Sequence, residues 1–145
     1  MNTLRLIAAL GLLCTAAAPA APRDRIDAKA LKDKVSLTLG SKGTIQLKQQ
    51  GDALTEAKLV KEPDEKQPGI SVEFKKYPEF LALKLKNGLP KALRYRAAIR
   101  LKGSEDYFET SLILPVHAGI VGFETWKDPI EELILFDFKL TDEKL

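Results

Sequence analysis

Apolar and polar residues alternate with a period of two through most of this chain from Val35 onward. The clearest run is Leu93–Leu101, in which one set of alternate positions is apolar and the other holds three arginines and one alanine. Because successive side chains of a β-strand point to opposite faces, such a run predicts a strand with one buried face and one face in solvent. No stretch after Val35 keeps helical spacing long enough to build a β-α-β unit. The pattern therefore predicts an all-β protein.

Turn residues separate about eight such runs along the chain. The turns include Gly40–Gly43, Gly51–Asp52, Asn87–Lys91, Gly103–Asp106 and Lys127–Pro129. Short strands at near-regular spacing are typical of a sandwich or a small barrel, and strands with one wet face are typical of antiparallel sheets. We therefore predict an antiparallel β-sandwich of about seven to eight strands, immunoglobulin-like in general plan, with a small β-barrel as the alternative.

The first 20 residues have the layout of a secretory signal peptide: a basic start with Arg5, the apolar run Leu6–Cys14, and a small-residue cleavage site that ends at Ala20. The apolar run is shorter than the roughly 20 residues that a membrane-spanning helix needs. Lipidation of Cys14 would require a small residue before it, and Leu13 stands there. We therefore expect cleavage after Ala20, no transmembrane segment in the mature chain, and a periplasmic location, with extracellular secretion as the alternative.

Cleavage at this site divides the chain into three parts. Residues 1–20 form the signal peptide, residues 21–34 a flexible or short helical lead-in, and residues 35–145 a single β-sandwich domain. Removing 20 of the 145 residues leaves 125, which is enough to bury a core without disulfides. The only cysteine is in the leader, so none remains to form one. The leader also holds one basic residue and no acid, so the net charge falls from +3 to +2, which argues against a general nucleic-acid binder.

His117 is the only histidine of the chain and the first candidate for chemistry. A catalytic triad would need a nucleophile and an orienting acid beside it, and no serine lies in a recognisable nucleophile motif. A zinc site usually draws several ligands from His and Cys. The carboxylates also lack the spacing of calcium loops or of a glycosidase pair. We therefore expect a turn histidine, no enzymatic activity, no cofactor and no metal, with a hydrolase that uses His117 and carboxylates as the less favoured alternative.

Basic residues crowd the polar positions on both sides of the Asn87–Lys91 turn. If this turn closes a hairpin that pairs Leu85 with Leu93, then Lys84 lies directly opposite Arg94 on the outer face. Like charges that face each other across a ladder destabilise it, so a partner should offset them. The hairpin therefore predicts a basic sheet face that seeks negative charge.

A second expected hairpin, through Gly103–Asp106, places Arg100 opposite Glu109 and neutralises that end of the strand. Four basic residues then remain without an obvious acidic partner: Lys84, Lys86, Arg94 and Arg96. They could receive carboxylate or phosphate groups of a partner, for which the planar fork of arginine is suited. Alternatively, they form a solvated outer face that keeps the sheet from aggregating.

The segment Pro115–Pro129 is the other candidate for recognition. It combines the only histidine and the only tryptophan with Phe123 in a stretch of weak alternation. Tryptophan is enriched at binding hot spots, and loops of rigid sandwiches often carry recognition. The alternative is that Gly119 and Gly122 mark a bulge while Phe123 or Trp126 fills the end of the core.

These features favour a small exported protein that binds without chemistry of its own. We expect a periplasmic protein–protein interaction module, such as an inhibitor, an immunity-type protein or an envelope accessory protein, whose partner is another envelope or secreted protein. The alternative is a binder or carrier of anionic envelope molecules, either a small anion or a lipid head group, through a basic sheet face. The candidate binding residues are Lys84, Lys86, Arg94, Arg96, His117, Phe123 and Trp126.

Overall fold

The computed structural model describes residues 23–62, 66–110 and 113–142; the predicted signal peptide, with Cys14, lies outside these ranges. Antiparallel strands dominate the described chain, as the alternation predicted. Within these ranges no helix is both long enough and apolar enough to cross a membrane. The elements are β1 (Arg25–Ile26), the 3-10 turn η1 (Ala28–Ala30), β2 (Val35–Leu37), β3 (Lys42–Gln50), β4 (Ala53–Val60), β5 (Gly69–Lys76), β6 (Leu81–Asn87), β7 (Ala92–Leu101), β8 (Tyr107–Glu109), β9 (Val121–Trp126) and β10 (Ile130–Thr141).

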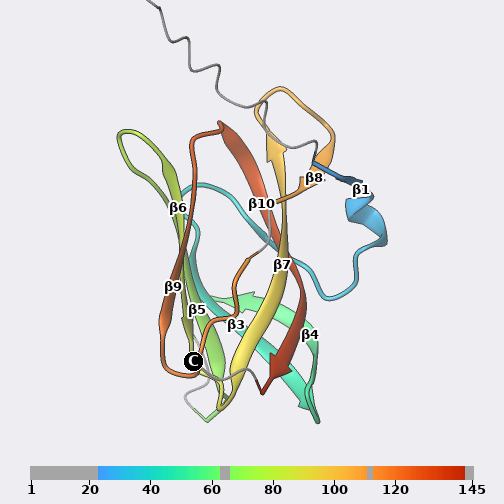
Figure 1. Ribbon diagram of the computed structural model, residues 1–145, viewed down its shortest axis with the longest axis vertical. Helices are drawn as coiled ribbons and strands as arrows, with labels where there is room; N and C mark the ends of the chain where they lie inside the picture. Colours follow the sequence, from blue (N-terminus) through green and yellow to red (C-terminus); the bar gives the residue numbers. More distant parts are fainter. Residues whose placement is uncertain (1–22, 63–65, 111–112, 143–145) are drawn as a thin grey trace, which may run out of the picture.

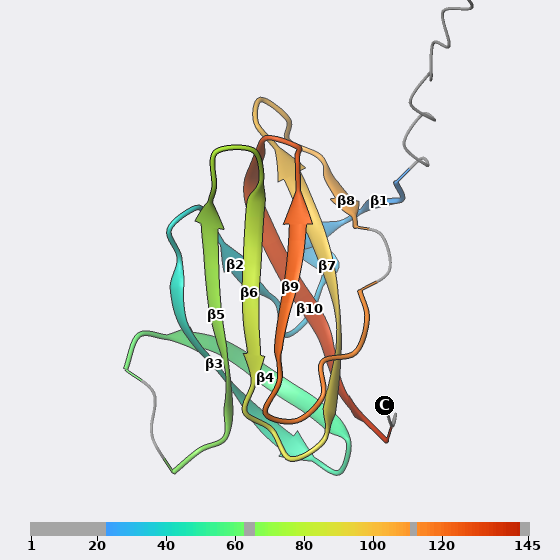
Figure 2. The same ribbon diagram turned by 60° about the vertical axis from the view of Figure 1, so that its left-hand side comes forward.

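The strands form one ten-stranded sheet that folds over on itself into two packed layers (Figures 1 and 2). The hydrogen-bonded order is β1-β8-β7-β10-β4-β3-β5-β6-β9, and β2 pairs with β10 beside this path. We call β3, β5, β6 and β9 the β9 layer, and β1, β2, β7, β8 and β10 the β10 layer; β4 joins them. Because the path has two ends, the sheet is open. The fold is therefore sandwich-like and is not the barrel of the alternative.

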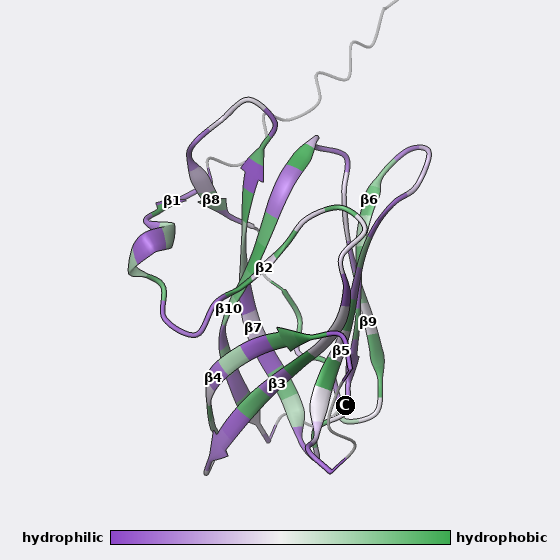
Figure 3. Cartoon of the chain, turned by 180° about the vertical axis from the view of Figure 1, so that it is seen from behind, coloured by the Kyte–Doolittle hydropathy of each residue, from purple (hydrophilic) through white to green (hydrophobic). Residues whose placement is uncertain are grey.

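The core lies between the two layers, and the long strands contribute alternate residues to it (Figure 3). On β7 the predicted inner positions from Leu93 to Ile99 are all buried, which confirms the face assigned to this strand. At the other side of the core, Phe74 of β5 meets Trp126 of β9 edge-on, with ring centroids 6.3 Å apart. Alternation therefore identified the buried faces of β5 and β7 correctly.

The middle of the β10 layer is buried on both of its faces. Ala98 of β7 and the neighbouring Ile134 and Phe136 of β10 form a second cluster outside the main core, and each is at most 3% exposed. The segment with β1 and η1 covers them, and Ala28 packs into this cluster. This cover explains why the outward positions of β7 hold an alanine between two arginines, since a long side chain at that place would meet the covering segment.

The connection Asn87–Lys91 does not close a hairpin, so that prediction is wrong. β6 pairs with β5 and β9, whereas β7 pairs with β8 and β10. The connection therefore carries the chain from one layer to the other. Leu85 and Leu93 are both fully buried, but they belong to opposite layers. A hairpin within one layer and a crossing between two layers both agree with a period of two. The crossing buries both leucines in the core between the layers.

A buried asparagine holds this crossing in place. Asn87 is fully buried, and its Nδ2 donates hydrogen bonds to the carbonyl oxygens of Lys91 and Val116, both at 2.8 Å. Its Oδ1 accepts a hydrogen bond from the Leu89 backbone N–H at 2.9 Å. One side chain therefore ties the crossing to the segment that precedes β9.

β10 pairs with three other strands. It runs along β7 for most of its length, pairs with β2 through Leu133–Leu135, and meets β4 at Lys139. The ladder with β7 is interrupted between Phe136 and Lys139, where Asp137 adopts a φ of 53°. An interruption of this kind bends a strand locally. It divides β10 into a part beside β2 and a part beside β4.

Candidate binding surfaces

The structure separates the predicted basic residues onto two layers. Lys84 and Lys86 lie on β6, on the outer face of the β9 layer. Arg94 and Arg96 lie on β7, on the outer face of the β10 layer. Outer faces of packed layers point in opposite directions. The two pairs of cations therefore cannot form one basic patch.

Arg96 is held by acidic neighbours, so the prediction that it lacks a partner is wrong. Its guanidinium donates two hydrogen bonds to Glu109, at 2.7 and 2.6 Å, and lies 3.8 Å from Asp137. It also lies 5.0 Å from the centre of the Phe136 ring. The hydrogen bonds raise the pKa of Arg96 and lower the pKa of Glu109. Arg94 is exposed but is not without a partner either, so these arginines are not an open anion acceptor.

The acid that holds Arg96 is one that the sequence predicts as the partner of another arginine. Sequence analysis places Glu109 opposite Arg100, whereas in the structure Glu109 lies opposite Ala98. Arg100 instead contacts Glu131 at 2.9 Å and Glu132 at 3.3 Å, both on β10. Arg100 is therefore neutralised by acidic residues, as expected, but by those of β10. The register of β7 against β8 brings Glu109 to Arg96 instead.

Lysines dominate the outer face of the β9 layer. Lys84 lies between Glu73 of β5 and Phe123 of β9, and Lys42 of β3 lies on the far side of Glu73. No ion pair joins these lysines, or the outward Lys75 and Lys86, to another residue of the described ranges. We call this surface the basic outer face; it comprises Lys42, Lys75, Lys84 and Lys86 around Glu73 and Phe123.

Phe123 stands at the free edge of the basic outer face. Its side chain is 60% exposed, and its strand, β9, is the last in the hydrogen-bonded order. Alternate residues of an edge strand direct their N–H and C=O groups away from the sheet. Since β9 pairs only with β6 in the described part of the chain, these groups are open to a further strand. Phe123 and the edge of β9 together offer an apolar anchor and a backbone template.

The other two candidates of Pro115–Pro129 lie elsewhere. Trp126 is 9% exposed and packs against Phe74, so the structure places it in the core. His117 is half-buried, and its carbonyl accepts a hydrogen bond from the Ile120 N–H at 3.0 Å, which closes a turn. Across the described ranges, no three or more His, Cys, Asp or Glu side chains gather in a way that could hold a metal ion.

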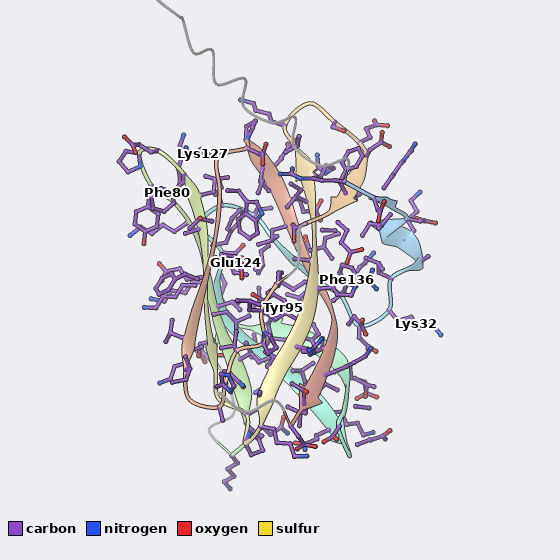
Figure 4. The ribbon with its side chains drawn as sticks, viewed as in Figure 1. Lys32, Phe80, Tyr95, Glu124, Lys127 and Phe136 are labelled. Carbon is purple, nitrogen blue, oxygen red and sulfur yellow. The ribbon has the colours of Figure 1, made fainter. Side chains whose placement is uncertain are left out.

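The carboxylate of Glu124 faces the core, and Glu124 is not among the candidate residues predicted from the sequence. It lies opposite the buried Leu83, and therefore points between the layers, where Figure 4 shows it on the same side of β9 as Tyr95 of β7. Burial raises the pKa of Glu124. Burial, and secondarily the charge of Glu124, raises the pKa of Tyr95. Glu124 stands two places before Trp126, and residues two places apart on a strand share one face. This spacing is the feature of the sequence that could have shown that Glu124 faces the core.

We expect Glu124→Gln to be more stable than the unaltered protein at neutral pH. A carboxyl group whose pKa is raised by folding binds its proton more readily in the folded chain, so its charge costs stability above that pKa. The cost shrinks as the pH falls through the raised pKa of the folded state, and it disappears below the pKa of the unfolded state, where the carboxyl group is protonated in both states. Urea unfolding from pH 7.5 to pH 4 should therefore show an advantage of the glutamine variant that shrinks on acidification. An advantage that is independent of pH would contradict this account.

No sequence pattern marks a cleft that lies at one end of the sandwich. Its volume is about 490 Å³, and most of its lining comes from the β2–β3, β5–β6, β7–β8 and β9–β10 turns. Leu39 is 44% exposed there, and Tyr77 and Phe80 are each 38% exposed. The rings of Tyr77 and Phe80 are stacked, with centroids 5.0 Å apart. We call Leu39, Tyr77 and Phe80 the aromatic end; they come from two turns that are far apart in the sequence.

The fold and these surfaces define an open antiparallel β-sandwich with exposed apolar side chains at an edge and at one end. No protein-family model matches the chain, and no curated protein and no solved structure shows significant similarity to it. Function is therefore inferred from the surfaces of this chain.

Proposed function

We propose that this chain is an exported, non-catalytic binding protein that recognises a protein partner through the basic outer face. The observation that carries the proposal is Phe123, which is 60% exposed in the middle of an edge strand. Next to it lies Lys84, which forms no ion pair with another described residue. Aromatic anchors surrounded by polar residues are typical of protein interfaces.

The spread of the lysines supports an extended acidic partner. Lys42, Lys75 and Lys84 lie on three different strands, and neighbouring strands are about 4.8 Å apart. Their charges therefore cover a surface instead of converging on one point, as they would around a small anion. A partner with acidic side chains distributed over its own surface would be attracted to this face and oriented by it.

The edge of β9 supports an extended segment as the part of the partner that docks. Strand addition to an open edge supplies affinity through backbone hydrogen bonds and specificity through alternate side chains. A segment paired with β9 would place its own side chains beside Phe123 on the outer face. The periplasmic location expected from residues 1–20 belongs to this proposal, because it decides which proteins the chain can meet.

The alternative of an anionic envelope molecule is less well supported. It depended on the arginines of β7, and Arg96 is already bonded to Glu109 at both of its near nitrogen atoms. An anion at this place would have to displace a bidentate carboxylate. The lysines of the basic outer face could attract anions, but they lack the planar donor geometry that selects a carboxylate or phosphate group.

The test compares what different variants of the protein retain from an envelope extract. We expect the unaltered protein to retain a defined protein, and Lys84→Glu/Lys86→Glu to reduce its retention by at least about tenfold through like-charge repulsion. Phe123→Ser should also reduce it, through loss of the apolar anchor. Retained proteins are quantified by mass spectrometry, and circular dichroism confirms that each variant is folded.

A matched control separates this surface from general charge effects. Lys29→Glu/Lys32→Glu reverses the same number of charges at exposed residues beside the β10 layer, and it should retain the partner unchanged. Equal losses in both double variants would show attraction by net charge alone and would contradict a specific interface. Retention that survives the changes at Lys84, Lys86 and Phe123 would exclude the basic outer face as the binding surface.

A further inference from the structure

The aromatic end is a second exposed apolar surface, and it adjoins the basic outer face at Lys75, whose Nζ lies 5.4 Å from the centre of the Tyr77 ring. The β5–β6 and β9–β10 turns meet at the same end of the sandwich in both views (Figures 1 and 2). The Tyr77 N–H donates a hydrogen bond to the Phe80 carbonyl at 2.8 Å, so the turn that carries both rings is closed. Because the rings are already stacked and ordered, presenting them to a partner costs little additional entropy.

Lysines border the aromatic end, while most of its acids are engaged. Lys76, Lys102 and Lys127 line the cleft and are exposed, and none forms an ion pair with another described residue. Figure 4 shows Lys127 and Phe80 at this end of the molecule. Of the acids that line the cleft, Asp128 bonds Arg23 at 2.8 Å and Glu131 bonds Arg100 at 2.9 Å.

Only one acid of the cleft, Glu79, is therefore left without an ion pair within the described residues. Three lysines that are not neutralised face this single carboxylate around a patch of exposed rings. The end of the sandwich is thus both apolar and positively charged.

We propose that the aromatic end docks on the surface of a lipid bilayer that contains anionic lipids. Tyrosine and other aromatic rings favour the boundary between head groups and acyl chains. Lysines at the same level can extend their charged ends to the head groups while their stems remain among apolar atoms. Each basic residue near an anionic bilayer adds attraction, and apolar side chains that enter the interface add the rest. Charge complementarity thus favours a negatively charged membrane over a neutral one.

This inference goes beyond the protein partner proposed above, since it concerns a different surface. Docking by the end of the sandwich leaves the outer faces of both layers perpendicular to the membrane plane, where they remain accessible to other proteins. The basic outer face could therefore bind its partner while the protein rests on a membrane.

The test measures sedimentation with vesicles of phosphatidylcholine alone and of an equimolar mixture of phosphatidylcholine and phosphatidylglycerol. We expect the unaltered protein to bind the mixed vesicles, to bind neutral vesicles weakly, and to lose binding as salt is raised. Lys102→Glu/Lys127→Glu should lower the partition coefficient on mixed vesicles by at least about tenfold. Tyr77→Ser/Phe80→Ser should lower it several-fold on the same vesicles.

The matched control is Lys84→Glu/Lys86→Glu, which makes the same change in net charge on the basic outer face. This variant should keep vesicle binding while losing the protein partner, so failure of one proposal is distinguishable from failure of the other. All variants share the same N-terminal residues, so any contribution of residues 1–22 cancels. Equal binding to both vesicle types, or equal loss in both lysine variants, would overturn membrane docking. Retention of a protein that only the variants of the aromatic end lose, without vesicle binding, would overturn it in favour of a protein ligand.

Discussion

Ile99→Ala should lower the free energy of unfolding by about 2–5 kcal/mol. Ile99 is fully buried, and it lies between Leu133 of β10 and Phe108 of β8. Removing its outer methyl and methylene groups loses their transfer free energy and leaves a cavity between two paired strands. Strands held by hydrogen bonds on both sides cannot close together to fill it, so we expect a value well inside this range.

Urea titration followed by tryptophan fluorescence measures this effect. The single tryptophan, Trp126, is 9% exposed in the folded protein, so its emission reports entry of water into the core. Lys84→Ala is the control, because an exposed side chain without an ion pair in the described chain should change stability by no more than about 0.5 kcal/mol. If the two costs were reversed, the alternation would be out of phase by one residue on both β6 and β7, and the inner positions of both strands would be wrong.

Asn87→Ala should destabilise the protein by about 2–4 kcal/mol although it removes only a small polar group. The variant would leave the buried Leu89 N–H and the Lys91 carbonyl without the side-chain partners that they have now. The Val116 carbonyl would keep the hydrogen bond that it accepts from the Leu93 N–H at 2.8 Å. A buried group that loses its partner bears the full cost of its desolvation, which is larger than the net gain of making a hydrogen bond.

Asn87→Asp provides a control of nearly identical shape. An ionised carboxylate at this place would face the carbonyl oxygens of Lys91 and Val116, which the amide now serves as a donor. Burial and this repulsion would raise its pKa, so the aspartate variant should gain stability as the pH falls, whereas the alanine variant should not. Thermal unfolding of both variants at pH 7 and pH 4.5 makes the comparison. Equal responses to pH would mean that the hydrogen bonds of Asn87 do not hold the crossing.

The period of two predicted the face of each long strand but not its neighbours. The inner positions of Leu93–Leu101 are correct because burial depends only on which side of the strand a residue lies. The Asn87–Lys91 connection has the composition of a hairpin turn, yet it crosses between layers. Local composition predicts that the chain turns at Asn87–Lys91. It does not predict which strand the next strand pairs with, because that depends on the packing of the whole sheet.

The candidate site was predicted in part for the same reason. Lys84, Lys86 and Phe123 do share one outer face, because alternation places each of them outside the core. Arg96 does not, since its strand belongs to the other layer. The aromatic end could not be found from the sequence, because Leu39 joins Tyr77 and Phe80 only after two distant turns are brought to one end of the sandwich.

The position of β10 in the chain has a consequence for when the protein can fold. β10 is paired with β2, and Leu133 lies opposite Leu37, so this contact spans most of the described chain. Until β10 has left the ribosome, β7 lacks its main partner, and β2 lacks the one strand with which it pairs among the described elements. Contacts of such long range form slowly, so the two layers should not assemble into the sandwich until β10 is available. In the export proposed above, this delay would keep the chain in a form that can be threaded through an export channel, with folding completed on the far side.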